Sequence, residues 1–270
     1  MKRIALLAAL LSSFAVSASA QQKIISLLPS HTEILFALNA SSVIAVSNFC
    51  NYPPAAAQLE KAGDLYNPNI EKIISLKPDL VVTGSWKSSP AAQRINRAGI
   101  KVLEIPDADS ITAIYSSIKT IGATVDRKKQ AAQLISSIRA KIAAASSTVK
   151  GKARPRVYIE VDLPHWTVGK GTFINDVLKT AGGDNIFADL KEPYAKISWE
   201  SVVERNPDII ISLTPSPVDY AQLPGADKIS AVAKNRVIAG LDKDIFVRPS
   251  PRVAQAVEIL AKALHETVKK

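Results

Sequence analysis

The chain offers few side chains that could attack a substrate or bind a metal ion. Its three histidines, His31, His165 and His265, are scattered and share no metal-ligand spacing. Cys50 is the only cysteine, which excludes a disulfide framework and a zinc site made of two or four cysteines. The sequence has no Gly-x-Ser-x-Gly elbow, no phosphate-binding Gly-rich loop and no His-Glu-x-x-His motif. Because no nucleophile comes with a base, we expect a protein that is not an enzyme, with no catalytic residues, metal site or cofactor.

These four side chains have plain structural interpretations. His31 falls in the first turn of an expected helix, where packing or hydrogen bonding is the more frequent role. His265 is typical of a helix surface, whereas His165 lies beside Trp166 on a connection that could face a ligand. We expect Cys50 to be buried, and a reactive or ligand-facing thiol is the alternative.

Aromatic rings indicate binding chemistry instead. Phe, Trp and Tyr make up only 6% of the chain, yet many of them fall on expected connections and not at helical spacing. These residues are Phe49, Tyr52, Tyr66, Trp86, Trp166, Tyr194 and Phe246. Rings on loops that face a cleft provide rigid apolar area at little entropic cost. The set predicts a cleft for a large, partly apolar ligand, while any single ring could instead cover its own lobe.

Two glutamates begin similar nine-residue units. Glu71 begins Glu-Lys-Ile-Ile-Ser-Leu-Lys-Pro-Asp, Glu200 begins Glu-Ser-Val-Val-Glu-Arg-Asn-Pro-Asp, and four strand-forming residues follow each unit. Each unit reads as a helix that is stopped by proline and followed by a strand. An acid in a first turn stabilises the helix dipole by roughly 0.3–1 kcal/mol, which explains either glutamate but not the recurrence. The repeat predicts two related lobes, each with an exposed carboxylate that could dock onto a cationic partner.

Short apolar runs alternate with helical segments along the chain and must position these side chains. The alternation predicts α/β lobes with mainly parallel sheets, whose ligands lie beyond the carboxyl ends of the strands or between lobes. Near the start, the run 23–27 predicts a strand, and Ser30 is expected to cap the next helix while Glu33 returns to its amide.

One long helical pattern joins the expected lobes. Residues 123–150 contain neither Gly nor Pro, and Ala131, Leu134, Ile135, Ile138 and Ile142 recur at helical spacing. About 24 helical residues would reach about 36 Å, enough for a stiff connection between lobes. We therefore expect an N-terminal lobe over 21–122, a connecting backbone helix over 123–150 and a C-terminal lobe over 151–270.

The first residues have the form of a signal peptide. Lys2 and Arg3 precede an apolar stretch over 4–16, and Ala18-Ser19-Ala20 resembles a cleavage site. We expect residues 1–20 to be removed and the mature protein, starting at Gln21, to be soluble in the periplasm. Cys50 lies too far from this point to carry a lipid.

The net charge of +10 invites a nucleic-acid interpretation. We reject it because the lysines are spread along helices and no basic run alternates with aromatic residues. Solvated helix faces account for most of this charge, and weak attraction to anionic ligands is a possible addition.

Taken in order, these motifs resemble one family. The signal peptide, the opening over 23–33, Tyr52-Pro53-Pro54, the segment 69–79 and Arg248-Pro249-Ser250-Pro251-Arg252 are similar to the helical-backbone metal-receptor (class III) periplasmic binding proteins. That class serves ABC importers of cobalamin, ferric siderophores and haem. Asn51-Tyr52-Pro53-Pro54 and Gly182-Gly183-Asp184-Asn185-Ile186-Phe187 resemble most the vitamin B12-binding members.

The resemblance implies a chelatase-like or nitrogenase-like fold of two α/β lobes on one backbone helix, with only small opening motions. It implies a monomer that holds a corrinoid in the cleft and performs no covalent chemistry. Matching the motifs places ligand contacts at Phe49, Tyr66, Trp86, Trp166, Tyr194, Asp244, Phe246 and Arg248. Tyr66 is the neighbour of the matching position, and Phe49, Trp166 and Tyr194 replace one aromatic residue with another.

In the same comparison, Glu71 and Glu200 match the acidic pair that meets arginines of the membrane permease. The expected function is therefore capture of cobalamin and delivery to an ABC transporter permease. A ferric siderophore or haem is the alternative ligand, which Arg248 or Arg252 could meet, and a metal chelatase is a further alternative.

Overall fold

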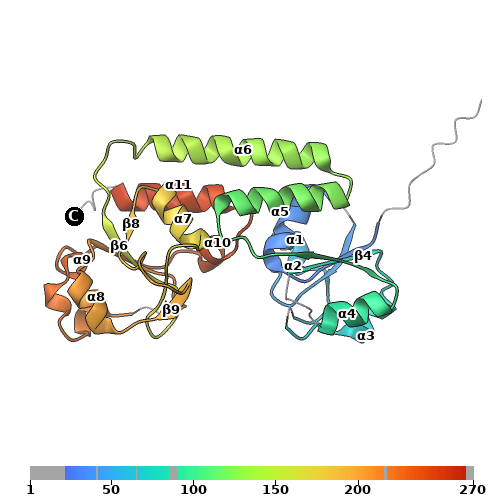
Figure 1. Ribbon diagram of the computed structural model, residues 1–270, viewed down its shortest axis with the longest axis horizontal. Helices are drawn as coiled ribbons and strands as arrows, with labels where there is room; N and C mark the ends of the chain where they lie inside the picture. Colours follow the sequence, from blue (N-terminus) through green and yellow to red (C-terminus); the bar gives the residue numbers. More distant parts are fainter. Residues whose placement is uncertain (1–21, 41, 65, 85–89, 216–217, 266–270) are drawn as a thin grey trace, which may run out of the picture.

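The computed structural model describes residues 22–40, 42–64, 66–84, 90–215 and 218–265, which form two lobes bridged by a long helix (Figure 1). The N-terminal lobe contains β1 (Ile24–Ser26), α1 (Pro29–Ala37), β2 (Val43–Val46), α2 (Pro54–Ala57), β3 (Glu60–Lys61), α3 (Ile70–Ser75), β4 (Leu80–Gly84), α4 (Pro90–Arg97), β5 (Lys101–Ile105) and α5 (Ile111–Thr124). Its strands form one parallel sheet in the order β3-β2-β1-β4-β5. β1 and β4, which are buried throughout, lie inside the sheet because their sequences, Ile-Ile-Ser and Leu-Val-Val-Thr-Gly, suit burial on both faces.

The C-terminal lobe has a smaller parallel sheet and an additional ribbon. Its elements are β6 (Arg156–Glu160), β7 (Trp166–Val168), α7 (Phe173–Thr180), β8 (Asp184–Asn185), β9 (Tyr194–Lys196), α8 (Trp199–Arg205), β10 (Ile209–Ser212), η1 (Tyr220–Gln222), η2 (Ala226–Lys228), α9 (Ser230–Ala233), β11 (Val237–Ile238), α10 (Lys243–Val247) and α11 (Val253–His265). The parallel sheet has the order β11-β10-β6-β8, and β7 pairs with β9 in an antiparallel ribbon. The expected fold class, two α/β lobes with mainly parallel sheets on a backbone helix, is thus observed.

The backbone helix is α6 (Lys128–Ser147), which is shorter than the expected span 123–150. Residues 123–124 belong to the end of α5. Asp126 has a φ of 54°, a left-handed conformation that ends the preceding helix and turns the chain into α6. The 20 residues of α6 correspond to a length of about 30 Å.

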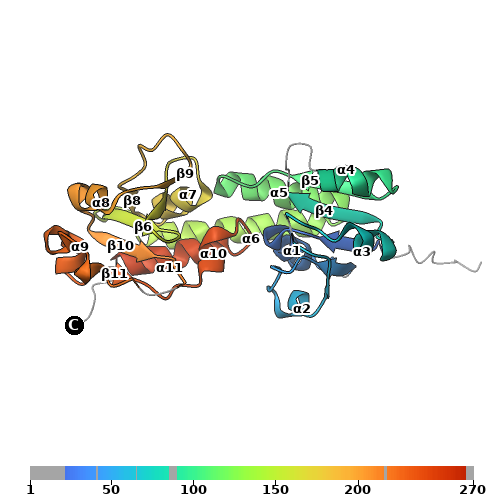
Figure 2. The same ribbon diagram turned by 90° about the horizontal axis from the view of Figure 1, so that it is seen from below.

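The two lobes share a hydrophobic core under α6. α6 packs on α5 of the N-terminal lobe and on α11 of the C-terminal lobe, and Figures 1 and 2 show these two helices lying at opposite ends of it. One continuous cluster of buried side chains runs from Ile24 through Ile118 and Ile138 to Leu264. Each lobe has a further cluster on the other side of its sheet. Within the described residues, no helix has the length and apolar character needed to cross a bilayer.

Candidate ligand-binding cleft

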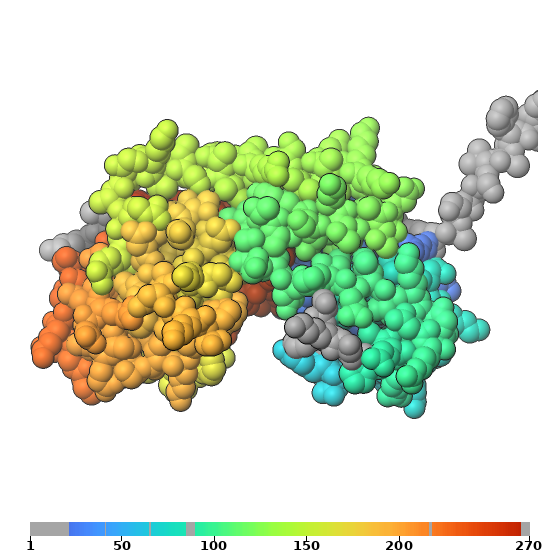
Figure 3. All heavy atoms as spheres, in the orientation of Figure 1, coloured from blue at the N-terminus to red at the C-terminus, as the bar shows by residue number. Residues whose placement is uncertain are grey.

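A cleft of about 560 Å³ opens between the lobes, and Figure 3 shows the hollow on the side away from α6. Its walls come from segments that are far apart in the sequence. The N-terminal lobe contributes Leu28, Pro29, Ser30, Tyr66, Asp107, Ala108 and Asp109. The C-terminal lobe contributes Gly171, Thr172, Phe173, Pro193, Tyr194, Val247, Arg248 and Pro249. The cleft therefore lies beyond the carboxyl ends of β1 and β5, which is where α/β sheets usually bind ligands.

Four of the predicted contact rings are exposed in the structure. The exposed fraction is 71% for Tyr66, 57% for Phe49, 49% for Tyr194 and 40% for Trp166. Tyr66 and Tyr194 line the cleft from opposite lobes. Trp166 belongs to the same ribbon as Tyr194, because β7 pairs with β9. Phe49 is joined to the cleft through its carbonyl oxygen, which accepts a hydrogen bond from Arg248 at 3.3 Å.

Tyr194 and Asp107 face each other across the cleft. Burial and, secondarily, the nearby Asp107 carboxylate raise the pKa of the Tyr194 phenol. Burial also raises the pKa of Asp107. The phenol therefore remains a hydrogen-bond donor at neutral pH, so this part of the cleft combines an apolar ring with polar groups.

Arg248 and Asp244, both predicted ligand contacts, are joined in a polar network that crosses between the lobes. Arg248 Nη2 lies 2.7 Å from Asp244 Oδ2. Asn51 of the N-terminal lobe accepts from Arg248 Nη1 at 2.6 Å and donates to Asp244 Oδ2 at 3.0 Å. Of these three side chains, only Arg248 lines the cleft, and its neighbours fix its position there.

Glu33 makes a second connection between the lobes. Its carboxylate accepts two hydrogen bonds from Arg252, at 2.8 Å from Nε and at 2.6 Å from Nη2. Arg252 also lies over the ring of Tyr52, 4.2 Å from its centroid. The predicted capping box is therefore wrong: α1 begins at Pro29 after Leu28, with no side-chain cap, and Glu33 reaches a residue 219 positions away.

Two predicted ring contacts differ from the other four. Phe246 is only 2% exposed and belongs to the shared core, so its ring is not available at the cleft surface and this expectation is corrected. The cause is its place in α10, whose short turn directs Ile245 and Phe246 inward. Trp86 lies outside the described residues.

Glu71 and Glu200 occupy equivalent places in the two lobes. Each lies in the first turn of a short helix, α3 or α8, whose N-cap, Asn69 or Ser198, accepts a hydrogen bond from a backbone amide. Both glutamates are exposed. Figure 1 shows α3 and α8 on the side of the lobes that faces away from α6.

His31 and Cys50 are used in the interior, whereas His165 and His265 are half-buried. Cys50 is fully buried, with its Sγ 3.1 Å from the hydroxyl oxygens of Thr32 and Ser47. His31 is 2% exposed, its Nδ1 has no hydrogen-bond partner, and burial lowers its pKa to about 4. In the part of the chain that the structure describes, no three His, Cys, Asp or Glu side chains are grouped so that they could hold a metal ion.

A buried carboxylate that sequence reasoning missed supports the C-terminal wall. Glu160, at the end of β6, is fully buried and accepts from the backbone amide of His165 at 2.7 Å and from the hydroxyl of Tyr220. Its Oε1 also lies 3.0 Å from His165 Nδ1. The signal available in the sequence was an acidic residue at the end of an otherwise apolar strand. Through His165, Glu160 holds the connection that leads into Trp166 and β7.

Comparison with known proteins agrees with this architecture. The model of the periplasmic binding protein family matches residues 24–243. The vitamin B12-binding protein of Salmonella typhimurium is 33% identical over 96% of each chain. An uncharacterized ABC transporter substrate-binding lipoprotein of Bacillus subtilis is 35% identical over 90% of this chain and 80% of its own length.

Solved structures show the same fold with different ligands in their descriptions. A possible iron-binding protein of Staphylococcus epidermidis has a TM-score of 0.81 at 33% identity, covering 91% of this chain and 99% of its own. The periplasmic vitamin B12 binding protein of Vibrio cholerae has a TM-score of 0.74 at 28% identity, covering 90% and 96%. The periplasmic haem-binding protein of Roseiflexus has a TM-score of 0.78 at 25% identity, covering 91% and 98%. The chain belongs to the periplasmic binding protein family, as a non-enzymatic substrate-binding protein of the ABC importer type.

Proposed function

We propose that the protein binds cobalamin or a related corrinoid in the inter-lobe cleft and delivers it to the permease of an ABC importer. The observation that carries the proposal is the pair of exposed rings, Tyr66 and Tyr194, that face one cleft from opposite lobes. A corrin is a broad, flat, largely apolar ring system with polar amide side chains. Two aromatic walls with polar groups between them suit such a ligand.

The polar lining fits the edge of a corrinoid. Asp107 and Asp109 offer carboxylates from the N-terminal side of the cleft, and Arg248 offers from the other side a guanidinium held by Asn51 and Asp244. Amide groups both donate and accept hydrogen bonds, so a mixed lining of this kind can meet them. Relatives described as vitamin B12-binding proteins, aligned over nearly the whole chain, support the same ligand.

The binding test is a side-by-side titration with cyanocobalamin, cobinamide, a ferric siderophore and haem, followed by calorimetry and tryptophan fluorescence. We expect one corrinoid per chain and quenching that falls in Trp166→Phe, because Trp166 is exposed whereas Trp199 is buried. Tyr66→Ala with Tyr194→Ala should raise the Kd about tenfold or more. Ile74→Ala is the control, since this exposed apolar side chain lies outside the cleft lining. Absence of saturation by either corrinoid at micromolar concentration would reject the ligand.

Delivery is proposed to use the acidic pair. Glu71 and Glu200 project from equivalent helix starts on one side of the two lobes, which suits a two-point contact with cationic groups of a permease. Glu71→Ala with Glu200→Ala should leave the Kd for ligand unchanged and abolish transport in reconstituted vesicles. Glu104→Ala with Glu204→Ala removes the same charge from exposed positions and serves as control. Normal transport by the Glu71 and Glu200 double variant would remove the docking role.

A ferric chelate or haem is the second candidate. It is favoured by the exposed phenol of Tyr66 at the cleft, a group that ligates haem iron in other proteins, and by the neighbouring guanidinium of Arg248. Absorption spectra of protein isolated from its native host distinguish the candidates, since corrin, haem and catecholate-iron bands differ.

A further inference from the structure

The excess positive charge of the chain is concentrated in one segment. Residues 119–156 contain ten Lys or Arg and a single acid, Asp126, which gives a net charge of +9. The whole chain, with 34 basic and 24 acidic residues, has a net charge of +10. All the remaining residues together, 24 basic and 23 acidic, are therefore almost neutral. This segment contains α6, the helix that bridges the lobes.

Most of this charge is not neutralised by ion pairs within the described residues. We define the back face as Lys128, Lys129, Arg139, Lys141, Lys150 and Lys152, all of which are exposed. Among the residues that the structure describes, no carboxylate lies within ion-pair distance of these six side chains. Arg139 also lies over the ring of Tyr115, 4.9 Å from its centroid, and for that reason it is left unchanged in the variant below. Arg154 pairs with Asp184 at 2.8 Å, so its charge is neutralised and it is left out of the set.

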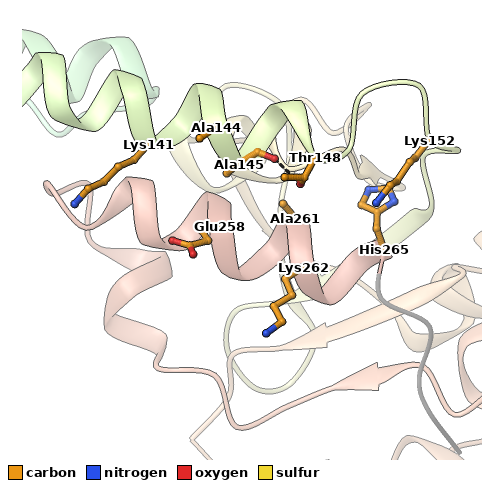
Figure 4. A pocket seen from close by; sticks show the side chains of 9 residues that line it. All are labelled: Lys141, Ala144, Ala145, Thr148, Lys152, Glu258, Ala261, Lys262 and His265. Carbon is orange, nitrogen blue, oxygen red and sulfur yellow. Dashed lines mark hydrogen bonds between the residues drawn. The ribbon is translucent and has the colours of Figure 1, made fainter.

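The back face is long and open. α6 carries four of its residues along about 30 Å, and Lys150 and Lys152 extend it past the end of the helix. Figure 4 shows the groove beside it, where Lys141 and Lys152 lie with Lys262 of α11 around a floor of Ala144, Ala145 and Ala261. Glu258 is the one carboxylate among the side chains lining this groove. Figures 1 and 3 place α6 opposite the cleft and opposite α3 and α8.

We propose that the back face binds the surface of an anionic phospholipid bilayer. Basic side chains near such a surface each contribute to binding through the negative surface potential, without needing a shaped partner. α6 contains no aromatic residue and no methionine, and its exposed residues are mainly Lys, Ala, Ser and Gln. Protein interfaces are enriched in aromatic residues and depleted in lysine, so this composition favours a lipid surface over a protein.

Binding by the back face has a geometric consequence. Since α6 lies on the side opposite the cleft, a protein attached through α6 keeps the mouth of the cleft directed away from the bilayer. Glu71 and Glu200 are then also directed away from the lipid. A chain attached in this way keeps its cleft open to ligand, but it has to leave the bilayer before α3 and α8 can meet a permease in the same membrane.

The test is sedimentation of the purified chain, beginning at Gln21, with vesicles of phosphatidylcholine alone or mixed with phosphatidylglycerol. The back-face variant carries Lys→Gln at 128, 129, 141, 150 and 152. The matched control carries Lys→Gln at 101, 170, 191, 228 and 234, five exposed lysines outside residues 119–156, so both variants lose equal charge. Circular dichroism verifies that both variants are folded.

We expect binding to the anionic vesicles only, at a salt concentration of about 0.1 M, and loss of binding near 1 M, where the Debye length is about 3 Å. The partition coefficient of the back-face variant onto anionic vesicles should fall about tenfold or more, and the control should bind like the unaltered chain. Equal losses in both variants would overturn the proposal in favour of net charge alone. Absence of binding to the anionic vesicles, or equal binding to vesicles of phosphatidylcholine alone, would also overturn it.

Discussion

The two lobes treat a buried polar group near the cleft in opposite ways. In the N-terminal lobe, His31 is buried in α1 with Nδ1 unpartnered, and its pKa is lowered to about 4. In the C-terminal lobe, the buried carboxylate of Glu160 is satisfied by His165 and Tyr220. The cores differ as well, since the cluster behind the first sheet is aliphatic, whereas the one behind the second includes Tyr158, Phe187, Trp199 and Tyr220.

The same difference extends to the rings that face the ligand. Phe49 and Tyr66 lie on loops between elements, whereas Trp166 and Tyr194 lie on the hydrogen-bonded ribbon of β7 and β9. The ribbon is fixed to Glu160 through His165. The comparison teaches that a buried carboxylate pre-organises one wall of the cleft, whereas the backbone of the other wall is held by exposed hydrogen bonds, from the Tyr66 amide to Asp64 and from Arg248 to the Phe49 carbonyl.

The largest effect is expected where the lobes meet. Glu33→Ala leaves Arg252 without its buried partner and should reduce the free energy of unfolding by about 4 kcal/mol, measured by urea denaturation. Lys72→Ala, which breaks the more exposed pair with Glu60, should cost less than about 1 kcal/mol. Equal costs would show that the connection between the lobes is no stronger than a surface ion pair.

The N-terminal lobe should make the protein sensitive to acid. Because the pKa of His31 is about 4 in the folded state and 6.5 as a model value, the unfolded state binds the proton more readily. The contribution of neutral His31 to the free energy of unfolding is therefore fully present above pH 6.5. It is lost as the pH decreases towards 4, by up to about 3 kcal/mol. His31→Gln should remove this part of the pH dependence. An unchanged pH profile in the variant would mean that the pKa of His31 is the same in the folded and unfolded states.

The C-terminal anchor should show a smaller but more specific effect. Glu160→Gln keeps the shape but weakens the hydrogen bonds of His165 and Tyr220, and we expect a loss of about 2 kcal/mol in stability. Since the ribbon would loosen, the Kd for ligand should rise further than the loss of folded protein explains. Tyr220→Phe removes only one of these hydrogen bonds, so its stability and its Kd should lie between those of Glu160→Gln and those of the unaltered chain. A Kd unchanged by Glu160→Gln would separate the anchor from binding.

Local patterns in the sequence predicted the architecture well. The runs Val43–Val46 and Ile209–Ser212 are apolar enough to specify buried strands, and the recurring helix, Pro-Asp and strand unit revealed two lobes. The ends of helices were harder to predict. Asp126 adopts a left-handed conformation inside a segment without Gly or Pro, so the predicted connecting helix was longer than the observed one.

The cleft could be predicted only in part, because its polar connections are long-range. Rings on expected connections indicated the cleft, and Tyr66 and Tyr194 do line it, although Tyr194 belongs to the strand β9. Nothing local indicates that Glu33 binds Arg252, that Asn51 joins Asp244 and Arg248, or that the Phe246 ring is taken into the core. Such pairings depend on how the lobes are placed, which no single segment encodes.

The core that continues beneath α6 limits how this protein can be re-engineered. Ile118, Ile138 and Leu264 belong to one cluster, although they come from the first lobe, the bridge and the last helix. A chimera that exchanged one lobe for that of a relative would place mismatched side chains against α5, α6 and α11 at once. Recombination to change ligand preference is therefore better confined to the segments that carry the exposed rings, so that all three helices come from the same parent protein.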